Sequence, residues 1–192
     1  MYEIPTQITV GEQSFTIRDK GDYRIVLDCF AYLSDDELTE QESLYACLIA
    51  FYEAFNDFDD VLKCEVDLNI LIEKMFSFFN CDDTNPGIKK PYKVIDWEGD
   101  SQLICSAINK VAQQEVRAVE YMHWWTFMGY FCEIGESTLA TVVGIREKMM
   151  KGKKLEKYEK EFRRDNPQYF VWNSITQEQK KAEELFNQIW DK

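Results

Sequence analysis

The 192-residue chain has few of the residues that β-rich folds, metal sites and histidine chemistry require. Its 4 prolines and 8 glycines are too few for many tight turns, and His123 is its single histidine. The 6 cysteines include no C-x-x-C pair, so we expect reduced thiols and no metal site. No run of about eighteen apolar residues occurs, which argues against a membrane-spanning helix. The first residues lack a signal-peptide pattern, so we expect the protein in the cytoplasm of the cell that makes it.

Motifs of the common enzyme classes are missing as well. The sequence contains no P-loop, no G-x-G-x-x-G, no H-E-x-x-H and no calcium-binding loop. A general base at His123 would need a carboxylate and a nucleophile held beside it, and no serine or cysteine motif of that kind is present. We therefore expect that the protein is not an enzyme, that it has no cofactor, and that His123 is a hydrogen-bonded structural residue.

Apolar and aromatic residues are abundant. The hydrophobic fraction is 45%, and 13 Phe, 10 Tyr and 5 Trp can bury a substantial core. Helical periodicity dominates, so we predict a mainly α fold with a short N-terminal β-hairpin. We expect a single helical domain, 1–192. The alternative is two lobes, a hairpin with acidic helices in 1–85 and an aromatic core with basic helices in 86–192, divided at the irregular stretch around Pro86 and Pro91.

Local patterns predict the individual elements. The hairpin is indicated by apolar residues that alternate around Gly11, namely Ile8, Val10, Phe15 and Ile17. Capping residues mark the starts of four helices, namely Thr39 with Glu42, Asp100, Ser137 or Thr138, and Thr176 with Gln179. Helices are expected at 23–33, 39–55, 61–79, 100–111, 118–134, 138–150, 153–164 and 176–190.

Two apolar faces are candidates for a partner interface. The expected helix 61–79 has apolar residues spaced alternately three and four apart, as in a short heptad seam, and the last expected helix has a similar face. The candidate interface residues are Leu68, Leu71, Met75, Phe78, Phe186 and Trp190. The alternative is that both faces are buried in the core of one chain.

Charge is distributed unevenly along the chain, whose net charge is −13. Residues 1–100 hold 22 acidic and 8 basic side chains, whereas residues 101–192 hold 13 and 14. Nine basic and four acidic side chains lie between Arg146 and Arg164. The acidic half argues against nucleic-acid binding. The basic segment could bind the acidic half of a second copy, giving a homo-oligomer, or could be a solvated helix face with pairs such as Glu156 with Lys160.

The stretch YMHWWTFMGYF, residues 121–131, is the most unusual in the chain. Within the expected helix 118–134 it would be apolar around most of its circumference, which predicts that Trp124, Trp125 or both are buried. An exposed platform for stacking bases would need a basic groove beside it, and the acidic first half argues against that.

The order of residues from DWEGDSQLI to YMHWWTFMGYFCEIGESTLATVVGIRE resembles a family of short helical proteins of tailed phages and prophages. The family pattern is an acidic segment, a helix, Tyr-Leu-His-Trp-Trp-x-Phe, and then Ile-x-x-R. The residues of this chain that match it most closely are Asp100, Tyr121, His123, Trp124, Trp125, Phe127 and Arg146. Met122 replaces the leucine of the pattern.

The resemblance implies a tail assembly chaperone encoded between the major tail protein and the tape measure protein. Such a protein would bind the tape measure protein, and with it the tail tube protein, during tail assembly in the bacterial cytoplasm, and would be absent from the mature virion. The alternatives are a minor structural tail component and an acidic DNA mimic that binds a host protein. No nucleic-acid or membrane partner is expected. The motif residues would be structural.

Overall fold

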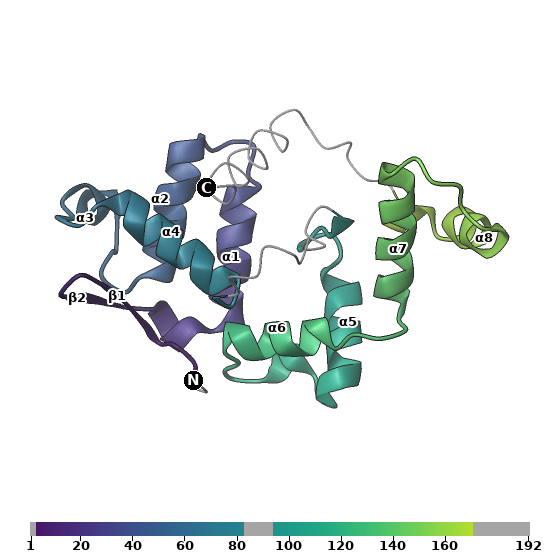
Figure 1. Cartoon of the computed structure of the whole chain (residues 1–192), viewed down its shortest axis with the longest axis horizontal. Coiled ribbons are helices and arrows are strands. Elements are labelled where there is room, and N and C mark those ends of the chain that lie inside the picture. Colours follow the sequence, from purple (N-terminus) through teal and green to yellow (C-terminus); the bar gives the residue numbers. More distant parts are fainter. Residues whose placement is uncertain (1–2, 83–93, 171–192) are drawn as a thin grey trace. The chain divides into compact units, whose positions relative to one another are not determined.

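The computed structural model describes residues 3–82 and 94–170. Eight α-helices and one two-stranded antiparallel hairpin lie in these residues, about 60% of which are helical (Figure 1), so the predicted fold class is confirmed. The strands are β1 (Gln7–Val10) and β2 (Gln13–Thr16). The helices are α1 (Tyr23–Leu33), α2 (Glu40–Phe51), α3 (Phe58–Leu62), α4 (Leu68–Phe79), α5 (Ser101–Ala112), α6 (Trp124–Cys132), α7 (Thr138–Met150) and α8 (Lys157–Asp165). Short 3-10 turns lie at Arg18–Gly21, Val116–Ala118 and Pro167–Tyr169.

Contacts within the chain group the described residues into two units. The first unit contains residues 3–82 and 120–128, and the second contains residues 94–119 and 129–170. The chain therefore leaves the first unit, builds part of the second, and returns to the first with the aromatic segment. This grouping differs from the expected lobes in the position of residues 120–128, and the lobe boundary near residue 85 stays a prediction.

The N-terminal hairpin forms as the alternating pattern predicted. Ile8 pairs with Phe15 and Val10 with Gln13, and the turn contains Gly11 with a positive φ of 61°. Phe15 is buried, and its ring centroid lies 5.8 Å from that of Tyr52. The hairpin thus contributes one apolar side to the core of the first unit.

The core of the first unit lies among α1, α2 and α4, which pack together in Figure 1. Thr39 and Glu42 form the predicted capping box at the start of α2. The Tyr52 hydroxyl donates a hydrogen bond of 2.8 Å to the Leu71 carbonyl, and burial raises the pKa of Tyr52 above its usual value. The most deeply buried side chains here include Phe51, Leu48, Met75 and Phe78.

The expected single helix over 61–79 is wrong. The structure has two helices, α3 and α4, separated by residues 63–67. Asp57 caps α3 by accepting a hydrogen bond from the Asp60 N–H, and Asp67 caps α4 by accepting one from the Asn69 N–H. Aspartate side chains compete with helical hydrogen bonding in this way, so two helix starts replace one continuous seam.

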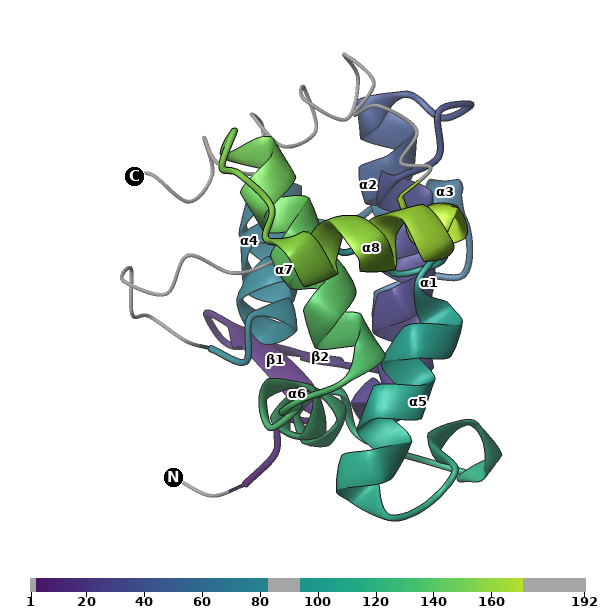
Figure 2. The ribbon, with the colours of Figure 1, turned by 90° about the vertical axis from the view of Figure 1, so that its right-hand side faces the viewer.

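The second unit is built from α5, α7 and α8, with α8 lying across α7 in Figure 2. Ser137 caps α7, as predicted, by accepting from the Ala140 N–H. Asp100 stands at the start of α5, but its side chain makes no capping hydrogen bond, because it is engaged elsewhere in the second unit. The Lys148 amine lies 2.7 Å from Glu159 and links α7 to α8, whereas the expected pair of Glu156 with Lys160 does not occur.

Helix α6 begins six residues later than the expected start at Ala118, because the backbone before it has other partners. The Tyr23 N–H donates to the Met122 carbonyl at 2.9 Å, and the Met122 N–H donates to Asp22 at 2.9 Å. Asp22 and His123 form an isolated antiparallel bridge. These bonds engage the backbone of residues 122 and 123 with the start of α1, so α6 begins only at Trp124 and Tyr121 lies outside the helix.

All six cysteines are free thiols, of which Cys29 and Cys47 are buried, Cys132 is exposed and the other three are half-buried. Cys29 and Cys47 are fully buried, and each thiol lies close to the backbone carbonyl of the other residue, at 3.8 Å and 3.4 Å. Burial raises the pKa of the Cys29 thiol well above its usual value. These two residues therefore pack as small apolar groups. In a separate finding, none of the helices in the described ranges is long and apolar enough to cross a membrane.

Candidate functional site: an aromatic segment and a buried ion pair

The aromatic segment, Tyr121–Phe127, binds four parts of the first unit through hydrogen bonds. The Tyr121 hydroxyl donates to the Lys20 carbonyl at 3.1 Å, and residue 122 is bonded to the start of α1 as described above. His123 reaches Pro5, which precedes β1, and the two tryptophans reach the end of α4. The segment therefore joins elements that are distant in the sequence. Pro5 and His123, for example, are 118 positions apart.

The adjacent tryptophans cap the C-terminal end of α4. The Trp124 indole N–H donates to the Phe79 carbonyl at 2.9 Å, and the Trp125 indole N–H donates to the Phe78 carbonyl at 2.9 Å. The last carbonyls of a helix have no partner within the helix, and two consecutive ones are satisfied here by two consecutive side chains. This arrangement explains why two tryptophans stand side by side, which the apolar pattern alone did not reveal.

The two tryptophans differ in burial. Trp124 is fully buried, as expected for at least one of the pair, and Trp125 is half-buried. The Trp124 ring stacks on Phe127 with centroids 5.7 Å apart and meets Phe30 edge-on at 5.8 Å. Aromatic pairs in these geometries stabilise a core beyond the apolar area that they bury.

His123 uses both ring nitrogens in structural hydrogen bonds. Nε2 lies 3.0 Å from the Pro5 carbonyl oxygen, which can only accept, so Nε2 carries the hydrogen. Nδ1 accepts from the Trp125 backbone N–H at 3.1 Å, so it carries none, and the ring caps the start of α6. With the side chain 2% exposed, neither nitrogen is available as a general base in this structure.

Gly21 makes room for this histidine. Its φ is +78°, and a Cβ atom built there would lie 3.0 Å from His123 Nε2 and 2.8 Å from the Phe78 ring. A side chain at position 21 would thus be strained in its backbone and would collide with the core. The absence of a side chain at Gly21, just before α1, therefore allows the His123 ring to occupy its position in the core.

Acid is expected to destabilise the first unit through His123. Burial lowers the pKa of His123 below 6.5, although the Pro5 carbonyl and the Asp22 carboxylate partly oppose this. Below pH 6.5 the unfolded chain gains a proton that the folded chain does not yet bind, so stability falls until the pH reaches the folded pKa. Above 6.5 the ring is neutral in both states and contributes no pH dependence.

One NMR titration checks the His123 prediction, because a single histidine gives a single imidazole Cε1–H signal. The expected midpoint in the folded protein is below 6.5. The free energy of unfolding of the unaltered protein should fall as the pH is lowered from 7 to the folded midpoint. In His123→Gln this fall is expected to be smaller, because the titrating imidazole is absent. A midpoint at or above 6.5 in the folded protein would show that the ring is solvated or held in its charged form.

In the second unit, Asp100 and Arg146 form a buried ion pair. The guanidinium donates to both carboxylate oxygens, Nη1 to Oδ2 at 2.5 Å and Nη2 to Oδ1 at 2.9 Å. The same guanidinium donates to the carbonyls of Val94, at 3.1 Å, and Tyr169, at 2.7 and 3.0 Å. Arg146 thus ties α7 to the start of α5, to residue 94 and to the turn after α8. Planar, bidentate geometry of this kind is specific to arginine.

The residues of the family pattern therefore separate into two clusters, one in each unit. Tyr121, His123, Trp124, Trp125 and Phe127 lie in the first, where the Phe127 ring also stacks on Tyr23 with centroids 4.4 Å apart. Asp100 and Arg146 lie in the second, 46 positions apart in the sequence but in direct contact. Every one of these side chains makes a packing or hydrogen-bonding contact within its own unit.

The candidate interface residues have a different outcome. Leu71, Met75 and Phe78 are buried in the core of the first unit, with exposures of 0–2%, and are not available to a partner in this structure. Leu68 is half-buried. Phe186 and Trp190 lie outside the described residues.

Sequence reasoning did not identify the role of Arg18. Its Nη2 donates to three carbonyls in and just after the last turn of α2, those of Ile49, Tyr52 and Phe55, at 2.7–3.1 Å. A guanidinium at a helix C-terminus satisfies carbonyls and complements the helix dipole. No local pattern could predict it, because the partners lie 31–37 positions away.

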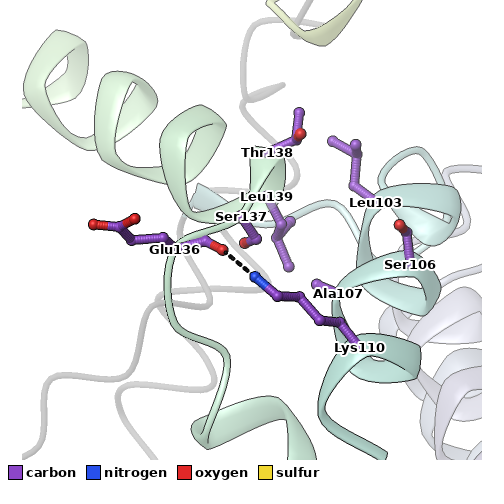
Figure 3. Close-up of a pocket in the computed structure, with 8 residues that line it drawn as sticks. All are labelled: Leu103, Ser106, Ala107, Lys110, Glu136, Ser137, Thr138 and Leu139. Carbon is purple, nitrogen blue, oxygen red and sulfur yellow. Dashed lines mark hydrogen bonds between the residues drawn. The ribbon is translucent and has the colours of Figure 1, made fainter. Parts of the chain in front are cut away.

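A shallow pocket of about 220 Å³ lies between α5 and the start of α7 in the second unit (Figure 3). Figure 3 shows Lys110 reaching across it, where its amine donates to the Glu136 carbonyl at 3.1 Å. The remaining lining consists of the hydroxyl-bearing residues Ser106, Ser137 and Thr138 and the apolar residues Leu103, Ala107 and Leu139. No group of three or more potential metal ligands occurs among the residues described.

A comparison with models of known protein families gives a match. A family model described as Bacteriophage Gp15 protein matches residues 3–170. The chain belongs to this family. The match covers the described residues of both units, including all seven residues of the aromatic and ion-pair clusters. The assignment to this bacteriophage protein family therefore applies to the whole described part of the chain. Neither a curated protein nor a solved structure matches the chain.

Proposed function

We propose that this Gp15 family member is a tail assembly chaperone that binds the tape measure protein and assists assembly of the tail tube. The observation that carries the proposal is the family match over residues 3–170, together with the motif resemblance to phage tail-assembly proteins. Long tape measure helices present apolar stripes, which a partner must shield until tube subunits assemble around them. The protein would therefore act in the host cytoplasm and be absent from the finished particle.

The placement of the motif residues supports a role in binding rather than catalysis. Trp124, Trp125 and His123 have their polar atoms committed to the backbone of the first unit, and Arg146 is committed to the second. Function then depends on the surface that these clusters hold in shape. A binding protein needs such a surface, because pre-organised contacts lose less conformational entropy on association.

Co-expression with the tape measure protein of the same phage tests the proposal. We expect the tape measure protein to accumulate in the soluble fraction with this chain and to precipitate without it. The double substitution Phe186→Ser with Trp190→Ser should reduce this effect, because that apolar face is the remaining predicted partner surface. Tyr32→Ser is the matched control, since Tyr32 is an exposed aromatic residue of α1. Equal precipitation with and without this chain would contradict the chaperone role.

A minor structural tail component is the second candidate, favoured by the same family match. The two roles differ in where the protein is found after assembly. Mass spectrometry of purified particles should not detect a chaperone, whereas a tail component should be present at a fixed number of copies per particle.

A further inference from the structure

An apolar patch with acidic surroundings is exposed on the first unit. Phe58 and Leu62 are 46% and 65% exposed and lie four residues apart on α3, so they face the same side. Tyr45 of α2 extends the patch, with its ring centroid 6.1 Å from that of Phe58. We call Tyr45, Phe58 and Leu62 the α3 surface. Large apolar side chains that adjoin one another at a surface are typical of interaction sites.

The rim of the α3 surface is negative. Between residues 53 and 67 the sequence has six acidic side chains and one lysine. That lysine, Lys63, lies 3.6 Å from Asp59, so part of its charge is already matched. An occupant of the α3 surface should therefore combine apolar side chains with positive charge.

The second unit has an exposed surface with these properties. Met149 and Met150 at the end of α7 are 37% and 48% exposed, and Tyr158 at the start of α8 is 62% exposed. The Tyr158 hydroxyl donates to Glu159 at 3.3 Å, and Glu159 pairs with Lys148, the residue before Met149, so Tyr158 lies near the end of α7. We call Met149, Met150 and Tyr158 the α7–α8 surface. Methionines adapt their shape to a partner, and tyrosines are enriched at interfaces.

The rim of the α7–α8 surface is positive. Within the described residues Lys153, Lys154 and Lys157 have no ion-pair partner, whereas Lys148 and Lys151 pair with Glu159 and Glu147. Lys153 also acts on the Glu147 carboxylate. Between residues 147 and 161 six lysines stand against four glutamates, so the segment keeps a net positive charge that can meet an acidic surface. The two surfaces match in both respects, because each has two or three exposed apolar residues and the charges of their rims are opposite.

We propose that the α3 surface binds the α7–α8 surface of a second copy of this chain, so that copies associate head to tail. Each copy has one surface of each kind, which makes the contact heterologous and allows rings or chains to form. Repeated copies would present repeated binding sites to a long partner, and linked sites raise the effective concentration of each. The self-association itself requires no partner protein.

Sedimentation velocity of the purified full-length chain tests this inference. At low salt the sedimentation coefficient should rise with protein concentration over the micromolar range. Raising the salt concentration should weaken association, because exposed charges are screened beyond about 8 Å at physiological ionic strength. Phe58→Ser with Leu62→Ser, and separately Met149→Ser with Met150→Ser, should each weaken it by at least about tenfold, which corresponds to about 1.4 kcal/mol. Tyr32→Ser is the control and should associate like the unaltered protein.

Mixing the two double variants gives the decisive result. Each retains the surface that the other has lost, so an equimolar mixture should form a dimer that neither variant forms alone, and should form nothing larger. Circular dichroism should show unchanged helix content in both, since the substituted side chains are exposed. A monomer at every concentration would overturn the inference. Association that survives both double variants, or a mixture that stays monomeric, would also overturn it.

Discussion

Trp124→Ala is expected to lower the free energy of unfolding by about 3–5 kcal/mol, the range for truncating a fully buried tryptophan. The substitution removes a ring that contacts Phe30 and Phe127 and leaves a cavity at the end of α4. It also leaves the buried Phe79 carbonyl without the indole donor. Urea unfolding followed by circular dichroism measures the effect, and Tyr32→Ala, at an exposed position, should change stability by no more than about 0.5 kcal/mol.

Comparing substitutions of the two tryptophans distinguishes the contribution of the indole hydrogen bonds from that of ring packing. Trp124→Phe and Trp125→Phe each keep an aromatic ring and remove one indole donor. The Phe78 carbonyl also accepts from the Cys81 N–H at 2.9 Å, so it keeps a partner in Trp125→Phe. We therefore expect the larger loss from Trp124→Phe, about 1–3 kcal/mol for a buried acceptor left unpaired. Equal, negligible losses in both variants would mean that the indole hydrogen bonds do not stabilise α4.

Arg146→Met is expected to destabilise the second unit by about 3–5 kcal/mol, the loss typical of removing one partner of a buried ion pair. Asp100 is 3% exposed and would keep an uncompensated charge, and the Val94 and Tyr169 carbonyls would lose their donors. Arg146→Lys should recover only part of the loss, because an ammonium cannot contact the carboxylate and both carbonyls with the same geometry. Hydrogen exchange locates the effect: the backbone amides of α5 and α7 should exchange faster in Arg146→Met than in the unaltered protein.

A double-mutant cycle isolates the pair itself. Asp100→Asn with Arg146→Met removes both charges, so it should be less destabilising than the sum of the two single substitutions. Strictly additive losses would show that the two side chains act independently, despite Asp100 Oδ1 lying 2.9 Å from Arg146 Nη2.

Local signals in the sequence were sufficient for several elements. The alternation around Gly11, the capping box of Thr39 with Glu42, and Ser137 at the start of α7 are each decided within a few residues, and the structure has all three. The length of α6 could not be found in this way. Its start depends on Asp22 and Tyr23, which bind residue 122 from a hundred positions away.

The same limit applies to the candidate site. Apolar periodicity predicted that the aromatic segment is buried, but the indole donors bind carbonyls 45 and 47 positions earlier. Asp100 carries a correct helix-start signal, yet its carboxylate is used by Arg146 instead of the α5 backbone. In the seam of 61–79, Asp67 starts a new helix that an apolar pattern alone does not reveal. Long-range partners decide the first two cases, and a single sequence does not show which distant residues will meet. The Asp67 cap is local, two residues from its partner, but it lies inside an apolar pattern that predicts one helix.

The two structural clusters and the charged surfaces suggest a division of roles within the chain. The aromatic segment and the Asp100–Arg146 pair stabilise their own units, and the exposed α3 and α7–α8 surfaces remain for association. A chaperone for a long helical partner would use the exposed surfaces for binding, and the structural clusters would keep those surfaces folded. Substitutions in the clusters should therefore reduce function only as far as they reduce stability.

The most direct test of the proposed role is the aggregation of purified tape measure protein, followed by light scattering after dilution from denaturant. With this chain present in increasing amounts, scattering should fall in proportion and reach a plateau at a defined molar ratio, and the complex should elute as one species in gel filtration. The α1 control Tyr32→Ser should act like the unaltered protein. Scattering that is the same with and without this chain, at every ratio up to a several-fold excess, would contradict the account.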